Sequence, residues 1–318
     1  MANISEEEII CRFFARSTKA PIGIGDDAAV LAPSSGSRLA AATDALVSGI
    51  HFWPDDPPEA LGHKSLAVNL SDLAAMGATP RWALLAVCLP EAREAWLKAF
   101  SQGFFALADT HGVELVGGDT IKGPLGFCVT LLGELPHDLA LTRQGAREDD
   151  DIWVSGHLGA AALFLLAQEK KLSLFPEEEK GARGSFLFPT PRVALGQAIL
   201  PVASACIDIS DGLLADLGHI CEASGVGAQV FWENIPVLPV FRRLLHLPLA
   251  QEAIACGGDD YELCFTAPPG ARAALSEISQ NLGLPLSCVG KIVPRQKVAL
   301  LDKAGEELSF SRLGYAHF

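Results

Sequence analysis

Acidic residues at the ends of short apolar runs are the feature that most limits how this chain can fold. The stretch Gly23-Ile24-Gly25-Asp26-Asp27 places two adjacent carboxylates between glycines and the apolar run that follows. Glycine lets the backbone turn tightly and approach a ligand closely. A carboxylate beside a core is costly unless hydrogen-bond donors or a cation meet it. The fold must therefore bring such groups to these acids.

The same arrangement recurs along the chain. The further acids of this kind are Asp44, which follows Ala41-Ala42-Thr43, Asp72 within Leu66–Met76, Asp119 after Gly117-Gly118, Asp208 and Asp211 within Ile207–Gly212, and Asp259 and Asp260 after Gly257-Gly258. Oxygen ligands suit Mg²⁺, which keeps several waters and binds substrate phosphates. Crowded carboxylates cannot all ionise without a cation, because each raises the pKa of its neighbours. We expect the acids to converge on divalent metal ions and, through them, on polyphosphate.

Each acid taken alone also has an ordinary structural interpretation. Gly-Asp and Asp-Gly pairs are typical of turns, and Asp211 before a helix is a good N-cap. The number of acids at strand ends favours a common site, whereas spacing alone does not establish that they converge.

Length, composition and charge narrow the class of protein. A length of 318 residues predicts about two domains. The formal net charge of −14 argues against nucleic-acid binding, which needs a basic face. The 8 cysteines form no C-x-x-C pair, so they are expected to be reduced and mostly buried. The acidic start is unlike a signal peptide, and no apolar run approaches the ~20 residues of a membrane span. A cytoplasmic protein with no membrane partner is expected.

Alternating strand and helix patterns predict α/β or α+β layers. Expected helices cover residues 5–16, 57–77, 91–110, 159–167, 191–203 and 213–223, and expected strands cover residues 39–43, 82–89, 113–116, 127–132 and 152–155. The strand at 39–43 is expected to carry Asp44 at its end, and 117–120 is expected to be an exit loop. The charged segment 169–188 is expected to be a mobile excursion. A polar stretch at 137–151 predicts domains of residues 1–140 and 141–318.

Several common site motifs are missing. The nearest string to a Walker phosphate loop is Gly62-His63-Lys64-Ser65, which lacks the upstream glycine and the Gly-Lys adjacency. The G-x-G at 23–25 has no third glycine in place for a dinucleotide fold. Neither G-x-S-x-G nor H-E-x-x-H occurs. Covalent hydrolase and zinc protease interpretations are therefore weak.

Taken together, segments through nearly the whole chain resemble the thiamine-monophosphate kinase family, which belongs to the superfamily of aminoimidazole ribonucleotide synthetase. The segments that carry the resemblance are Gly23–Asp27, Thr43–Phe52, Lys64–Ala78, Gly117–Thr120, Leu141–Ala146, Pro189–Arg192, Ile207–Leu213, Gly257–Leu263 and Gly314–Phe318. They occur in the family order, and together they are specific where any one alone is weak.

The resemblance implies a two-domain α/β (α+β) fold with the N-terminal sheets of two subunits paired in a homodimer. The N-terminal domain would bind metal and ATP, and the C-terminal domain would complete the site. It implies ATP-dependent phosphorylation of thiamine monophosphate to thiamine diphosphate, with several Mg²⁺ ions. The implied metal ligands are Asp27, Thr43, Asp44, Asp72, Asp119, Asp208 and Asp211. The implied ATP contacts are Asp27, Gly118, Asp119, Arg143 and Ser210, and the implied substrate contacts are His51, Asp259 and Tyr315.

The chain departs from the family pattern at a few positions. Ala42 stands where relatives often carry Ser, which leaves only a backbone carbonyl there. Asp259 stands where Glu is frequent, so its reach toward substrate is shorter. The triple acid Asp149–Asp151 replaces a Pro-Gly-Asp turn at the domain link.

Phosphoryl transfer needs positioning and charge neutralisation more than covalent chemistry from the protein. Since the acceptor is a phosphate already ionised near neutral pH, no general base and no catalytic side chain are required. We expect direct in-line transfer without a phospho-enzyme. Two alternatives remain open: another ATP-using enzyme of the superfamily, making an aminoimidazole or a selenophosphate, and a non-catalytic nucleotide-binding dimer. The first is disfavoured by Asp260–Leu263, Gly49–Phe52 and the terminal His317-Phe318.

Overall fold

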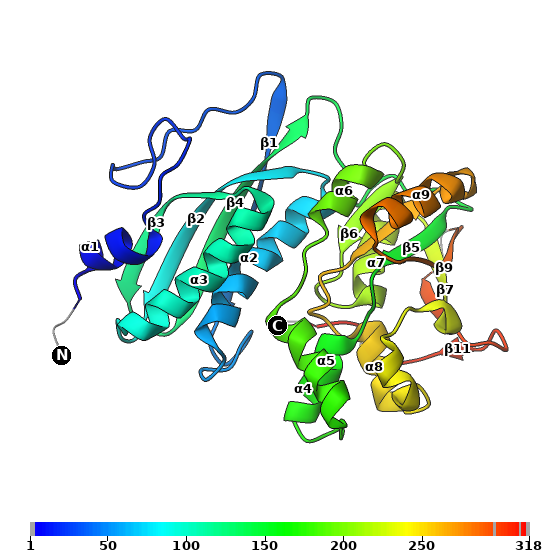
Figure 1. The fold of residues 1–318 in the computed structure, drawn as a ribbon. Coiled ribbons are helices and arrows are strands. Elements are labelled where there is room, and N and C mark those ends of the chain that lie inside the picture. Colours follow the sequence, from blue (N-terminus) through cyan, green and yellow to red (C-terminus); the bar gives the residue numbers. More distant parts are fainter. Residues whose placement is uncertain (1–3, 295–296, 312, 316–318) are drawn as a thin grey trace. The chain divides into compact units, whose positions relative to one another are not determined.

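The protein folds as two compact units, each with its own sheet and core (Figure 1). A computed structural model describes residues 4–294, 297–311 and 313–315. Unit 1 comprises the described residues of Met1–Leu73 and Ala78–Asp138, and unit 2 those of Ala74–Gly77 and Leu139–Phe318. The expected α/β class with α+β layers is confirmed. The end of the family-like segment Gly314–Phe318, residues 316–318, lies outside the described residues.

Unit 1 is a four-stranded sheet in the order β1-β4-β2-β3, with two long helices on one face (Figure 1). Its elements are α1 Glu6–Ile9, the π-turn η1 Ile10–Phe14, β1 Ser37–Val47, α2 Pro58–Ala75, β2 Thr79–Leu89, α3 Glu94–His111, β3 Glu114–Lys122 and β4 Gly126–Pro136. β4 is antiparallel to β1 and β2, whereas β2 and β3 are parallel. Along β2, Leu85 and Val87 are buried and Leu84 and Ala86 are exposed, as expected for a sheet covered on one side.

Two glycines let helices α2 and α3 pack closely. A Cβ atom added at Gly62 would lie 2.0 Å from the carbonyl oxygen of Phe100, and one at Gly103 would lie 1.9 Å from that of Glu59. No side chain fits at these distances, so the two backbones touch. This contact fixes the part of α2 that carries Asp72 within unit 1.

Unit 2 contains a seven-stranded sheet in the order β11-β10-β7-β9-β5-β8-β6. Its strands are β5 Asp151–Ser155, β6 Ala205–Asp208, β7 Gly227–Phe231, β8 Leu263–Ala267, β9 Leu286–Val293, β10 Val298–Leu301 and β11 Glu307–Leu308. Its helices are α4 Ala160–Gln168, α5 Pro176–Leu187, α6 Val193–Ile199, α7 Leu213–Ser224, α8 Pro248–Cys256 and α9 Arg272–Leu282, with 3₁₀ turns η2 Trp232–Asn234, η3 Pro239–Leu244 and η4 Pro269–Ala271. β7 and β10 pair in parallel, and the other neighbours are antiparallel.

The triple acid at the start of unit 2 is built into the fold rather than confined to a link. Asp149 takes a left-handed φ of 69°, a conformation that glycine adopts most readily. Asp150 accepts hydrogen bonds from the backbone of Arg147 and the hydroxyl of Ser204. Asp151 is fully buried and paired with Arg272.

Several expected element boundaries were wrong. β1 continues past Asp44 because that residue pairs with Val129 of β4, and β3 continues through Asp119, which pairs with Ala86. The segment 169–188 is not a free excursion, since it contains α5 with Phe186 in its buried face. Among the described residues, no helix is both long and apolar enough to cross a membrane.

Candidate functional site

Two of the predicted metal ligands meet in unit 1. Asp44 of β1 is hydrogen-bonded through its side chain to Asp72 of α2, and His51 lies near enough for its charge to act on Asp44. Burial raises the pKa of Asp44, and this outweighs the lowering by Asp72 and His51. Two carboxyl groups in contact must share a proton or a cation, because the doubly ionised pair repels itself. The pair therefore has the chemistry of an incomplete cation site.

The His51 ring is fixed at the end of β1. Its Nδ1 accepts a hydrogen bond from the backbone N–H of Val47 at 3.0 Å, and its own backbone N–H donates to the Val47 carbonyl at 3.0 Å. A neutral His51 therefore carries its proton on Nε2. This turn brings the predicted substrate residue to the Asp44–Asp72 pair.

Other predicted residues of unit 1 do not join that pair. The hydroxyl of Thr43 lies between the Val129 carbonyl at 3.1 Å and the Thr130 hydroxyl at 3.0 Å, on the sheet face opposite to Asp44. Thr43 can thus offer only its backbone carbonyl on the side of Asp44. Asp119 is exposed and pairs with Ala86, on the uncovered face as well.

Backbone geometry explains the glycine before Asp119. Gly118 has a φ of 151°, and an added Cβ would lie 1.9 Å from the carbonyl oxygen of Leu85. Asp27 lies apart in an exposed loop closed by a bridge between Ile22 and Val30, and its backbone N–H donates to Asp26. The structure thus brings together Asp44, Asp72 and His51, but not Asp27 or Asp119.

A second acidic group forms in unit 2 where β6 leads into α7. The backbone N–H groups of Ser210, Asp211 and Gly212 all donate to one side-chain oxygen of Asp216, at 3.0, 3.0 and 3.1 Å. Asp208 and Asp211 lie close enough for their charges to act on Asp216. Asp216 is thus the residue that shapes this predicted metal-binding loop.

Sequence reasoning did not find Asp216. Burial, together with the charges of Asp208 and Asp211, raises its pKa to about 7 against hydrogen bonds that lower it. Its signal was an acid four residues after Gly212 in the first turn of a helix, a position that usually indicates ordinary helix capping.

The Gly257–Glu262 loop lies against the same turn. The backbone N–H of Asp259 donates to Ser210 at 2.9 Å, and that of Tyr261 donates to Ile209 at 2.8 Å. The backbone N–H of Tyr315 donates to Asp211 at 3.1 Å. The structure therefore brings the predicted substrate residues Asp259 and Tyr315 to the predicted ATP and metal residues Ser210 and Asp211.

Two further carboxylates hold this loop in place: Asp260, which was expected among the acids that converge on metal, and Glu262, for which the sequence predicted no role. Both carboxylate oxygens of Asp260 accept the backbone N–H of Gly159, at 2.9 Å each, where α4 begins. Glu262 is buried and accepts hydrogen bonds from Arg192 and from the Ser155 hydroxyl. The only indication of their role in the sequence was their position directly before the apolar strand β8.

The backbone of Arg143 lies at the C-terminal end of α7, whereas the loop that carries Ser210 and Asp211 precedes the N-terminal end of that helix. The carbonyl of Arg143 accepts a hydrogen bond from the Ser224 hydroxyl at the last residue of α7. α7 has 12 residues, so this point lies roughly 18 Å along the helix from Gly212. The predicted contact of Arg143 with ATP stays a prediction.

Neither acidic group is a complete metal site. Within the described part of the chain, no three His, Cys, Asp or Glu side chains lie close enough together to hold a metal ion. Mg²⁺ retains several waters and takes phosphate oxygens as further ligands. The one or two carboxylates that either group offers are therefore enough protein ligands for Mg²⁺. The donors present fit Mg²⁺ bound together with a polyphosphate rather than a closed protein cage.

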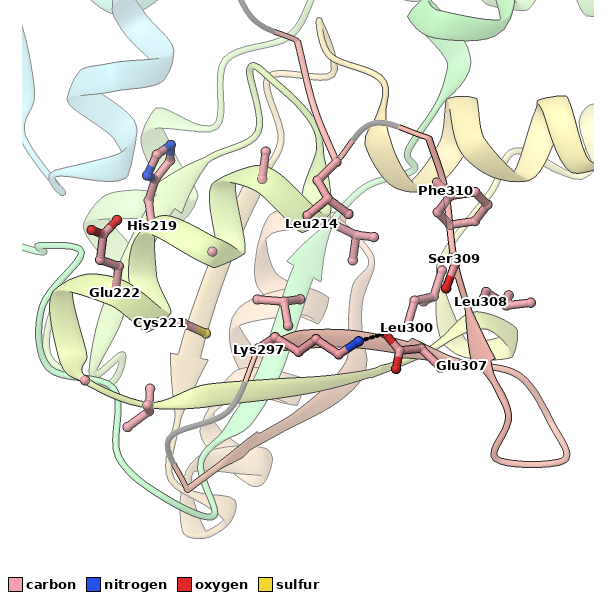
Figure 2. A pocket seen from close by; sticks show the side chains of 16 residues that line it. Leu214, His219, Cys221, Glu222, Lys297, Leu300, Glu307, Leu308, Ser309 and Phe310 are labelled. Atoms are coloured by element: carbon pink, nitrogen blue, oxygen red, sulfur yellow. Dashed lines mark ion pairs between the residues drawn. The ribbon is translucent and has the colours of Figure 1, made fainter.

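A groove of about 740 Å³ lies beside α7 in unit 2 (Figure 2). Its walls include Leu214 and His219 of α7 and Phe310 near the C-terminus, and Lys297 and Glu307 form an ion pair across it. None of the described residues that line it is a predicted site residue. The groove is therefore distinct from the acidic groups.

Two family models match the chain. The model of the AIR synthase related protein, N-terminal domain, matches residues 25–135, and that of the AIR synthase related protein, C-terminal domain, matches residues 147–303. The thiamine-monophosphate kinase of Salmonella typhimurium is 43% identical over 320 residues, which are 98% of each chain.

Solved structures are similar over nearly the same length. The thiamine-monophosphate kinase of Stenotrophomonas maltophilia superposes with a TM-score of 0.85 at 45% identity, covering 95% of this chain and 96% of that one. AaThiL complexed with AMPPCP and TMP gives a TM-score of 0.76 at 30% identity, covering 90% and 89%.

Proposed function

This chain belongs to the thiamine-monophosphate kinase family, and we propose that the acidic group of each unit binds Mg²⁺ and phosphate during phosphoryl transfer from ATP. The enzyme uses ATP to phosphorylate thiamine monophosphate to thiamine diphosphate. The observation that carries this function is similarity over almost the whole chain to thiamine-monophosphate kinases, one of which is solved with AMPPCP and TMP. The sibling activities of the superfamily are thereby disfavoured.

Asp44 and Asp72 would hold Mg²⁺ in unit 1, and Asp208 and Asp211 would hold it in unit 2. Asp27, Asp119 and the backbone carbonyl of Thr43 are further proposed ligands, although they lie apart from the side chains of the Asp44–Asp72 pair. This assignment is supported by the side-chain contact between Asp44 and Asp72, and by the charges of Asp208 and Asp211 gathered around Asp216. Bound Mg²⁺ would neutralise phosphate charge as it builds up in the transition state.

The remaining proposed site residues bind and orient ATP and thiamine monophosphate. Ser210, Gly118, Asp119, Asp27 and Arg143 form the proposed ATP contacts, with Arg143 suited to phosphate through its guanidinium fork. His51, Asp259 and Tyr315 form the proposed substrate contacts. The acceptor phosphate attacks in line without a protein base, since it is already ionised.

Purified protein incubated with ATP, Mg²⁺ and thiamine monophosphate is expected to release ADP and thiamine diphosphate in equal amounts. Removing Mg²⁺ with EDTA should stop both, and restoring it should recover both. Chromatography of thiamine species beside a coupled ADP assay measures this. Nucleotide binding with no ADP release would support the non-catalytic alternative, and ADP without thiamine diphosphate would contradict the proposed substrate.

We also propose a homodimer formed by the uncovered face of the unit 1 sheet. Large apolar side chains stand on that face: Leu39, Val47, Leu84 and Ile121 are 49%, 41%, 37% and 55% exposed. Apolar patches of this kind mark interaction surfaces, and a symmetric dimer would cover the same patch on both copies. The roles assigned to the two domains and the cytoplasmic location stay predictions.

Leu84→Asp is expected to convert the dimer to a monomer, because it places a charge on the apolar sheet face that the proposed interface would bury. Light scattering coupled to gel filtration measures the mass. Leu249→Asp is the matched control, since Leu249 of α8 in unit 2 is also 37% exposed. A monomeric wild type, or a Leu84→Asp variant that stays dimeric, would refute the interface.

A further inference from the structure

The loop that carries Asp259 is held in an unfavourable backbone conformation. Asp259 and Tyr261 have φ angles of 68° and 50°, in the left-handed region that side chains other than Gly, Asn and Asp rarely occupy. Such strain persists only where the surrounding structure imposes it. Here the backbone bonds of Asp259 to Ser210 and of Tyr261 to Ile209 impose it.

Within this loop the Tyr261 hydroxyl donates a hydrogen bond to Oδ1 of Asp259 at 2.9 Å. Tyr261 is only 8% exposed, so its ring is anchored in the protein and its hydroxyl has little freedom to move. An aspartate side chain has two rotatable bonds, and a fixed donor on one oxygen selects a single orientation for the carboxylate. The second oxygen then points in a defined direction.

Charge decides which part of the substrate Asp259 can meet. Asp259 and the phosphate of thiamine monophosphate are both anions and repel each other. The thiazolium ring is a cation and the aminopyrimidine carries N–H donors, and both attract a carboxylate. Asp259 would therefore recognise the thiamine part and leave the phosphate to the metal-binding acids.

We propose that Tyr261 is a positioning residue that aims Asp259 at the cationic, hydrogen-bond-donating part of thiamine monophosphate. It thereby sets the affinity for the thiamine substrate and leaves that for ATP unchanged. This inference rests on the proposed contact between Asp259 and substrate.

Tyr261→Phe keeps the ring and removes only the donor. The loss of a hydrogen bond to a charged group predicts a rise of about tenfold or more in KM for thiamine monophosphate. KM for ATP, kcat and the unfolding temperature should change little. A general structural role would instead shift all of these together, and that result would overturn the inference.

Asp259→Glu moves the carboxylate outward by one methylene, away from the fixed hydroxyl. The effect of Tyr261→Phe on KM should therefore shrink to less than about twofold in the Asp259→Glu background, as a double-mutant cycle measures. An equal effect in both backgrounds would show that Tyr261 acts on something other than Asp259.

Asp259→Ala distinguishes a failure of the positioning role of Tyr261 from a failure of the proposed contact between Asp259 and thiamine monophosphate. If Asp259→Ala leaves KM for thiamine monophosphate unchanged, Asp259 does not contact the substrate and both ideas fall. If Asp259→Ala raises KM strongly and Tyr261→Phe does not, the substrate contact stands and the positioning role is wrong.

Discussion

Asp44→Asn is expected to lower kcat/KM for thiamine monophosphate by about 10²- to 10³-fold, which corresponds to about 3–4 kcal/mol of transition-state stabilisation. The reason is the contact between the side chains of Asp44 and Asp72, in which burial raises the pKa of Asp44. A cation in this contact would let both groups ionise and would hold the phosphates to be joined. Asparagine keeps the shape of the side chain but removes its charge, so the cation would be lost or misplaced.

Thermal unfolding gives a second measurement that does not depend on turnover. Mg²⁺ that binds the folded wild type should raise its unfolding temperature, because binding to the native state alone stabilises it. Asp44→Asn should lose most of this shift. Without Mg²⁺ the variant should be about as stable as wild type, because a neutral amide can take the place of a buried carboxyl group that shares a proton with Asp72.

Asp109→Asn is the matched control. Asp109 lies in α3 of the same unit and forms an exposed ion pair with Arg16, which is worth little. It should keep wild-type activity and the full Mg²⁺-dependent shift. Equal activity in wild type and Asp44→Asn, or an undiminished Mg²⁺ shift in the variant, would remove Asp44 from the proposed metal site.

The sequence supports the pairing of Asp44 with Asp72 because both lie in elements with clear periodicity. The strand at residues 39–43 and the helix at residues 57–77 were both predicted, and the i, i+4, i+7 spacing of Ser65, Asn69 and Asp72 puts these three polar side chains on one face of that helix. The sequence did not show which side chains of a strand lie on the same face of the sheet as the helices. Thr43 and Asp44 are neighbours in sequence, yet alternation along β1 sends their side chains to opposite sides of the sheet.

The residues that shape the site were harder to predict than those expected to touch ligand. Asp260 and Glu262 hold a backbone N–H and a partly buried arginine that lie 101 and 70 residues away along the chain. The partners of Asp216 lie only four to six residues away, but an acid in the first turn of a helix is also typical of ordinary capping. α5 was missed for a related reason. Its run of charges is typical of a solvent-exposed segment. In the structure, however, Glu178 is buried and forms an ion pair with Arg243 of η3, which lies 65 residues away along the chain.

Asp216→Ala is expected to reduce kcat/KM by at least about 100-fold and to destabilise the protein by about 3 kcal/mol. One oxygen of Asp216 accepts three backbone N–H groups in the turn that carries Ser210 and Asp211. Alanine leaves these three donors beside a buried position, and each unsatisfied buried group costs about 1–3 kcal/mol. A turn that relaxes by about 1 Å costs on the order of 10² in rate.

Asp216→Asn tests whether the acceptor or the charge of Asp216 matters. Asparagine keeps one oxygen that can accept the same N–H groups, so its loss of stability should be well under half that of Asp216→Ala. Since the pKa of Asp216 is raised to about 7, the carboxyl group carries a proton in the folded state over a range where the unfolded state has lost it. A neutral amide is therefore a close mimic of the protonated carboxyl near and below pH 7.

The same pKa fixes how stability should depend on pH in the metal-free protein. The folded state binds more protons than the unfolded state between the ordinary pKa of 3.8 and about 7. The free energy of unfolding contributed by Asp216 must then fall as pH rises through this range. Residue 216 cannot titrate in Asp216→Asn, so the free energy of unfolding of this variant relative to wild type should rise between pH 4 and pH 7. Parallel curves for the two proteins would mean that Asp216 is already ionised in the folded state and holds the turn as a charged acceptor.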